Sequence, residues 1–155
     1  MLHTTLCYIE KDNAYLMLHR IKKKNDVNQD KWIGVGGKLE GRESIADCLR
    51  REVSEETGLT LTDYRYRGFI EFSCPPWPDE IMHLFTAAGF TGRLRDCNEG
   101  ELVWVPKDAL SRLTLWEGDK IFLKLLAQNA PFFHLELKYE GDTLRLARLD
   151  GQRLV

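Results

Sequence analysis

Three glutamates, Glu52, Glu55 and Glu56, lie within five residues of one another and form the group in this sequence best suited to chemistry. On a helix, this spacing places the three side chains within an arc of roughly 100°. Carboxylates held so close repel one another, and a cation beside them relieves the repulsion. Mg²⁺ suits such a cluster, because it binds a few carboxylates together with substrate phosphates. The alternative is a solvated acidic helix face, the usual meaning of such a charge run.

These glutamates need a helix to position them, and the sequence predicts one over residues 45–57. Ser44 is a suitable N-cap, Asp47 occupies the capping-box place three residues later, and Gly58 is a suitable stop. An apolar stripe borders the glutamate arc and consists of Ile45, Leu49 and Val53. The carboxylates are therefore expected at the edge of the buried face, on the floor of a cleft.

A diglycine, Gly36-Gly37, precedes this helix. Because glycine has no Cβ, backbone groups here can approach a phosphate or a metal closely. Lys38 beside the pair could neutralise a phosphate oxygen. Arg51 is expected to point away from the glutamate arc by roughly 60° or more and to form a structural ion pair with Glu43.

The segment over residues 37–59 matches the pattern G-x5-E-x7-R-E-U-x-E-E-x-G-U, where U is a bulky aliphatic residue. The matching positions are Gly37, Glu43, Arg51, Glu52, Val53, Glu55, Glu56, Gly58 and Leu59. This pattern is the Nudix box, and a chance match arises roughly once in 10⁹ starting positions. The sequence therefore resembles the Nudix hydrolases, which disfavours the solvated-face interpretation.

The resemblance implies the Nudix fold, an α+β fold with an α/β/α sandwich around a mixed β-sheet, over roughly residues 4–145. It also implies that the box glutamates hold Mg²⁺, with Mn²⁺ as a substitute, and that the ion bridges a diphosphate and activates water. Glu52, Glu55 and Glu56 are the implied ligands together with Gly37, and Glu56 is also the expected base. Glu99 matches a further ligand or base of the family, although its spacing alone would make it a surface residue.

The sequence is also similar to the MutT-type branch of the family, which removes 8-oxo-dGTP from nucleotide pools. The similar segments are residues 32–40 (WIGVGGKLE), 98–100 (NEG) and 116–119 (WEGD). A nucleoside triphosphate is the implied substrate, cleaved to a nucleoside monophosphate and pyrophosphate. The residues expected to bind it are Arg20, Gly36, Lys38, Trp116 and Asp119.

Trp116 and Asp119 are the candidates for binding the base, since an indole can stack on a purine and a carboxyl can pair with a base edge. Their structural alternatives are a core residue at a helix start and a first-turn acid favoured by the helix dipole. Vertebrate relatives carry Asn after the strand tryptophan and two adjacent acids after the helix tryptophan. This chain has Ile33 after Trp32 and Gly118 before Asp119. Preference for 8-oxo-dGTP over dGTP must then rest on Asp119, on backbone groups or on residues that the sequence does not identify.

Two other functions stay open at this level. One is a Nudix hydrolase of another nucleoside diphosphate derivative, such as ADP-ribose or a dinucleoside polyphosphate. The other is a non-catalytic nucleotide-binding module. The intact glutamate set disfavours the module, because a sensor has no need of every metal carboxylate.

Length and composition fit one domain spanning residues 1–155, with 43% hydrophobic and 30% charged residues. The net charge of −2 and the lack of a long basic stripe argue against binding a nucleic-acid polymer. The four cysteines show no C-x-x-C spacing and are expected to be reduced, and the four histidines are expected to be structural. With neither an export signal nor a long apolar run, the chain is expected in the cytoplasm and not in a membrane.

The remaining elements follow from periodicity and turn residues. Strands are expected over residues 3–10, 14–20, 31–35, 63–74, 80–90 and 101–105. A helical turn over residues 108–112, a helix over residues 117–128 and a hairpin over residues 132–146 complete the chain. The polar stretch over residues 21–31 is expected as an exposed loop, whose lysines Lys22, Lys23 and Lys24 solubilise the protein or attract phosphate.

Overall fold

The structure is a computed structural model that describes residues 1–22 and 25–155. Lys23 and Lys24, expected as solubilising or phosphate-attracting charge, lie outside the described residues. The described strands are β1 (Leu2–Lys11), β2 (Ala14–His19), β3 (Trp32–Ile33), β4 (Leu59–Ser73), β5 (Glu80–Gly92), β6 (Glu101–Pro106), β7 (Phe133–Glu140), β8 (Thr143–Leu149) and β9 (Gln152–Arg153). The described helices are α1 (Ile45–Thr57), the 3₁₀ helix η1 (Lys107–Arg112) and α2 (Glu117–Ala127).

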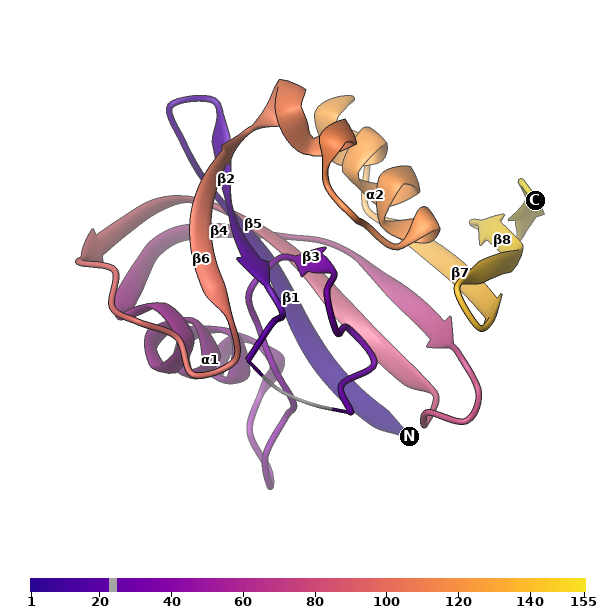
Figure 1. The fold of residues 1–155 in the computed structure, drawn as a ribbon, viewed down its shortest axis with the longest axis horizontal. Helices are drawn as coiled ribbons and strands as arrows, with labels where there is room; N and C mark the ends of the chain where they lie inside the picture. Colours follow the sequence, from indigo (N-terminus) through magenta and orange to yellow (C-terminus); the bar gives the residue numbers. More distant parts are fainter. Residues whose placement is uncertain (23–24) are drawn as a thin grey trace.

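These strands join into one sheet, in the order β3-β2-β1-β5-β4-β7-β8-β9, with β6 pairing with β2. β1 runs parallel to β5 and β4 runs parallel to β7, whereas the other neighbouring pairs are antiparallel. Helix α1 contacts β1 and β4, and α2 contacts β8 (Figure 1). The predicted α+β class and the mixed sheet are confirmed.

β1 shows why the helices lie on opposite faces, since successive side chains of a strand point to opposite sides of a sheet. Leu6 and Tyr8 belong to one buried cluster, which includes Phe122 of α2. Cys7 and Ile9 belong to a second buried cluster, which includes Leu49 of α1. One helix therefore covers each core, which is the predicted α/β/α sandwich.

Helix α1 begins and ends where its local residues predict. The Ser44 hydroxyl accepts a hydrogen bond from the Asp47 N–H at 3.1 Å, and Gly58 ends the helix in the left-handed region at φ 82°. The Asp47 carboxylate pairs with Arg50 on the helix surface. The prediction of helix 45–57 is confirmed residue for residue.

The bounds of two predicted strands were wrong, and one strand was missed. β4 begins at Leu59 and not at residue 63, because the chain pairs with Gly92 of β5 directly after Gly58. β3 has two residues and not five, because the chain then crosses to β1, where Val35 pairs with Cys7. β9 was not predicted at all.

All four cysteines are buried free thiols, as expected. The histidine side chains make structural contacts. His3 lies within hydrogen-bond distance of His83, His19 stacks on Trp32, and His134 pairs with Glu71. No helix in the described part of the chain is long and apolar enough to cross a membrane.

Candidate active site

The diglycine is held against β1 by backbone hydrogen bonds. The Thr5 N–H donates to the Gly37 carbonyl at 2.8 Å. A Cβ on Gly36 would lie 1.9 Å from the Thr5 carbonyl oxygen, and one on Gly37 would lie 2.3 Å from the Glu52 carboxyl carbon. Only glycine therefore fits here, and the lack of both side chains lets the carboxylates of α1 reach the loop backbone.

Glu56 is the most deeply buried of the three box glutamates. It is 8% exposed, and its Oε1 accepts the Gly36 N–H at 2.9 Å. Its Oε2 is buried and has no hydrogen-bond partner among the described residues. Burial raises the pKa of Glu56 to about 8, opposed by the Gly36 N–H and reinforced by repulsion from Glu99 and Glu52. A buried carboxylate with an unpartnered oxygen is a natural ligand for a cation.

Arg51 links the other carboxylates of the helix. It binds Glu43 through two nitrogens, at 2.6 and 2.9 Å, and this pair lowers the pKa of Glu43 to about 2. It also donates to Glu52 at 2.7 Å and to Glu55 at 3.2 Å. The predicted ion pair with Glu43 is confirmed, but the prediction that Arg51 points away from the glutamate arc was wrong. Its long side chain and forked guanidinium span both sets of acids.

The structure brings Glu99 to the same place from the loop before β6. The side chain of Glu99 accepts from Arg20 at 2.8 Å, and Arg20 also binds Asp26 at 2.7 Å. Glu99 is close enough to raise the pKa values of Glu52 and Glu56 by repulsion. Its proximity to the box glutamates could not be derived from spacing in the sequence.

The carboxylates do not form a ready-made cage. Within residues 1–22 and 25–155, no group of three or more His, Cys, Asp or Glu side chains has converged on one metal position. Arg51, Arg20 and the Gly36 N–H hold their oxygens instead. The residues nevertheless fit a divalent ion, since Glu56 Oε2 has no partner in the described part of the chain and both Glu52 and Glu56 have raised pKa values that a cation would lower.

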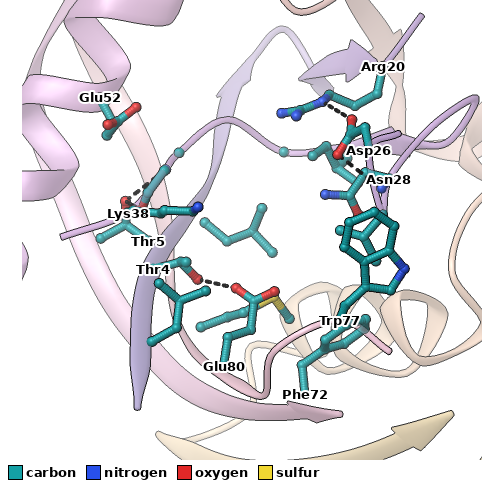
Figure 2. A pocket seen from close by; sticks show the side chains of 18 of the residues that line it. Thr4, Thr5, Arg20, Asp26, Asn28, Lys38, Glu52, Phe72, Trp77 and Glu80 are labelled. Carbon is teal, nitrogen blue, oxygen red and sulfur yellow. Dashed lines mark hydrogen bonds and ion pairs between the residues drawn. The ribbon is translucent and has the colours of Figure 1, made fainter. Parts of the chain in front are cut away.

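A cleft of about 470 Å³ starts at these acids (Figure 2). Its lining includes eight of the predicted site residues, namely Arg20, Gly36, Gly37, Lys38, Glu52, Glu99, Trp116 and Asp119. Glu55 and Glu56 are not among the lining residues. The side chain of Glu55 is 59% exposed beside Arg51, and Glu56 lies behind the diglycine backbone.

Trp116 and Asp119 lie at the start of α2 and are both almost fully buried. The indole N–H of Trp116 donates to the Asn28 side chain at 2.8 Å. Asp119 is 3% exposed, and burial raises its pKa to about 8, opposed by the charge of Lys31. Asp119 is therefore largely protonated at neutral pH and can donate as well as accept a hydrogen bond.

The two departures from the vertebrate pattern have structural consequences. Ile33 lines the cleft, so an apolar group stands where relatives have an amide. At Gly118, a Cβ would lie 2.5 Å from Leu137 and 2.6 Å from the Tyr139 hydroxyl oxygen. That hydroxyl accepts the Gly118 N–H at 2.6 Å. Position 118 therefore has no room for a second acid.

Sequence reasoning missed several residues of the cleft. Glu80 accepts a hydrogen bond from Thr4 at 2.8 Å, and burial raises its pKa (Figure 2). Asp26 and Asn28 position Arg20 and Trp116, and Trp77 belongs to the lining. A charged residue opening a strand is usually a surface residue, so Glu80 gave no signal. Trp77 did give one, because a solvent loop rarely retains an exposed indole between prolines.

Comparisons of the sequence and the structure with known proteins identify similar Nudix and MutT proteins. The sequence profile of the NUDIX domain family matches residues 3–126. The chain is 26% identical over 156 residues to the uncharacterized Nudix hydrolase YvcI of Bacillus subtilis, covering 97% of this chain and 95% of YvcI. It is 31% identical to the oxidized purine nucleoside triphosphate hydrolase of Danio rerio, covering 83% of both chains. A crystal structure of the MutT protein from Bacillus halodurans superposes with a TM-score of 0.85 at 26% identity, covering 98% of this chain and 99% of the other.

Proposed function

The chain belongs to the NUDIX domain family, and from this premise we propose that it is a Mg²⁺-dependent nucleoside triphosphate diphosphatase that prefers 8-oxo-dGTP. As a Nudix hydrolase it is an enzyme that acts on the phosphoric anhydride bonds of nucleotides. The products of the proposed reaction are a nucleoside monophosphate and pyrophosphate. The zebrafish relative, an oxidized purine nucleoside triphosphate hydrolase, supports the choice of substrate.

The observation that carries the proposal is the buried Oε2 of Glu56, behind the diglycine at one end of the cleft, for which residues 1–22 and 25–155 provide no hydrogen-bond partner. Glu52, Glu55, Glu56 and Glu99, with the Gly37 carbonyl, would hold the divalent ion. When bound, this ion supplies positive charge that stabilises the anionic transition state and lowers the pKa of the attacking water.

The chain's own residues position the phosphates and move the proton. Lys38 and Arg20 line the cleft beside the carboxylates, where their charges attract and orient phosphate oxygens. Glu56 takes the proton from water as the water attacks phosphorus and the bond to the pyrophosphate leaving group breaks.

Asp119 provides the recognition of the base in this proposal. Its carboxyl lines the cleft and is mostly protonated at neutral pH, so it can donate to a carbonyl and accept from an added N–H on an oxidised purine. Trp116 forms part of the wall beside it. With Ile33 unable to hydrogen-bond, Asp119 carries more of the selectivity than in the vertebrate pattern.

A product assay over a nucleotide panel tests the proposal. With Mg²⁺, and separately with Mn²⁺, we expect pyrophosphate and nucleoside monophosphate from 8-oxo-dGTP at a higher kcat/KM than from dGTP. ADP-ribose and a dinucleoside polyphosphate complete the panel. Faster cleavage of either would replace the proposal with another Nudix diphosphatase activity, and no cleavage of any member would indicate a binding module.

A further inference from the structure

Trp77 is a second tryptophan in the cleft, and it comes from the loop between β4 and β5. Trp77 is 38% exposed, whereas Trp116 is 4% exposed. Stacking on a base requires an accessible ring face, because the contact area supplies most of the energy. This difference separates the two indoles as candidates for stacking.

The indole of Trp116 is already in use. Phe72 and Tyr139 pack against it in edge-to-face geometry, with ring centroids at 5.2 and 4.8 Å. The Lys31 ammonium lies 4.2 Å from its ring centroid, and its N–H is bound to Asn28. These contacts and the burial of the residue limit the access of a base to this ring.

The indole of Trp77 is free by comparison. Within the described residues it has neither an aromatic neighbour nor a hydrogen bond from its indole N–H. Its backbone is held, because its N–H donates to the Cys74 carbonyl at 3.0 Å and prolines at positions 76 and 78 restrict the chain on both sides. A fixed backbone that carries an unused aromatic ring is suited to stacking with little ordering cost.

The direction of the cleft places Trp77 at the end where a base would lie. In Figure 2 its side chain stands on the opposite side of the cleft from Lys38 and Glu52. A nucleotide whose phosphates meet those two residues extends its base away from them, toward Trp77. Asn28 and Phe72 lie at the same end.

We propose that Trp77, and not Trp116, is the residue on which the base of the nucleotide stacks, with Trp116 acting as a buried support for the cleft wall. This inference rests on the proposed function for the nature of the ligand. It adds a residue from the loop between β4 and β5 to the base site. Stacking is tolerant of base identity, so Trp77 supplies affinity while Asp119 supplies selectivity.

Kinetics of Trp77→Ala and Trp77→Phe test the inference. For Trp77→Ala we expect KM to rise about 10-fold or more with kcat within a few-fold of wild type, the order expected for one base–aromatic stack. Trp77→Phe should restore most of the loss. Inhibition by pyrophosphate, which has no base, should be unchanged in both. Phe132→Ala is the matched control, since Phe132 is 54% exposed and does not line the cleft.

Direct binding separates this inference from the proposed function. Titration with 8-oxo-dGMP should quench the tryptophan fluorescence of wild type. The Kd obtained from the titration should rise at least about 10-fold in Trp77→Ala. Wild-type affinity in a folded Trp77→Ala protein, or no binding by wild type, would overturn the inference. Binding that depends on Trp77 in a protein that releases no pyrophosphate would overturn the diphosphatase proposal alone.

Discussion

Two buried acids, Glu56 and Asp119, define the chemistry of the cleft. Burial raises the pKa of each to about 8, but their surroundings differ. Glu56 lies among other carboxylates, so a divalent cation would return it to the ionised form. Asp119 is buried at the start of α2, and its charged neighbours are Lys31, which lowers its pKa, and Glu80, which raises it, so that it keeps its proton near neutral pH. One acid is thus suited to hold a metal and the other to bind a base.

Substitution of Asp119 should change which substrate is preferred. Asp119→Ala is expected to lower the ratio of kcat/KM for 8-oxo-dGTP to that for dGTP by about tenfold, since one buried hydrogen bond contributes about 1–3 kcal/mol. Asp119→Asn keeps a donor and an acceptor and should retain part of the ratio. In wild type the ratio should fall as pH rises through about 8, because the ionised carboxylate no longer donates. An unchanged ratio in Asp119→Ala would show that the base is read elsewhere.

The elements differ in how far their sequence predicts them. Helix α1 was predictable because its start and end depend on neighbours in the chain, Ser44 and Gly58. β3 was not, because its length is set by the crossing to β1 at Val35. The same distinction applies to the candidate site. The glutamate cluster follows from local spacing, whereas the places of Glu80 and Trp77 depend on loops and strands distant in sequence.

The close packing around Gly118, at the start of α2, can be tested by substitution. Gly118→Ala should destabilise the protein by about 1–3 kcal/mol, because its Cβ overlaps Leu137 and the Tyr139 hydroxyl. Tyr139→Phe removes that hydroxyl and its hydrogen bond, so it should cost about 1 kcal/mol by itself. In the double variant the clash is partly relieved. Its loss of unfolding free energy, measured in urea, should therefore be smaller than the sum of the losses in the two single variants. Strict additivity would contradict the close contact.

The whole molecule unites distant segments at one cleft. Arg20 follows β2, Glu99 precedes β6, Trp77 joins β4 to β5, and Asp119 opens α2. The mixed sheet makes this possible, because its parallel pairs place β1 beside β5 and β4 beside β7. Sequence reasoning identified the fold through the box, but spacing alone could not identify which distant residues share the cleft.

The two raised pKa values make the stability of the metal-free protein depend on pH. A carboxyl with a folded-state pKa of about 8 contributes stability below its unfolded pKa of about 4, and this contribution is lost as pH rises toward 8. In excess chelator, Glu56→Gln should therefore become more stable than wild type above pH 8, by on the order of a few kcal/mol.

Mg²⁺ distinguishes the two sites in the same experiment. Added Mg²⁺ should stabilise wild type and reduce its difference from Glu56→Gln, because the ion favours the ionised carboxylate. Asp119→Asn is the matched control. It should also be more stable than wild type above pH 8, but Mg²⁺ should not reduce the part of this difference that comes from position 119. A pH profile identical in wild type and Glu56→Gln would show that Glu56 titrates normally.

The most direct test of the carboxylate site is the rate of pyrophosphate release by Glu56→Gln with saturating Mg²⁺, on the nucleoside triphosphate that wild type cleaves fastest. The substitution keeps the volume of the side chain and removes its charge, so kcat should fall by about 10²-fold or more while the thermal transition stays cooperative. Glu101→Gln, at an exposed position of β6, should leave the rate unchanged. Wild-type turnover by a folded Glu56→Gln protein, or full wild-type activity in excess chelator, would contradict the account.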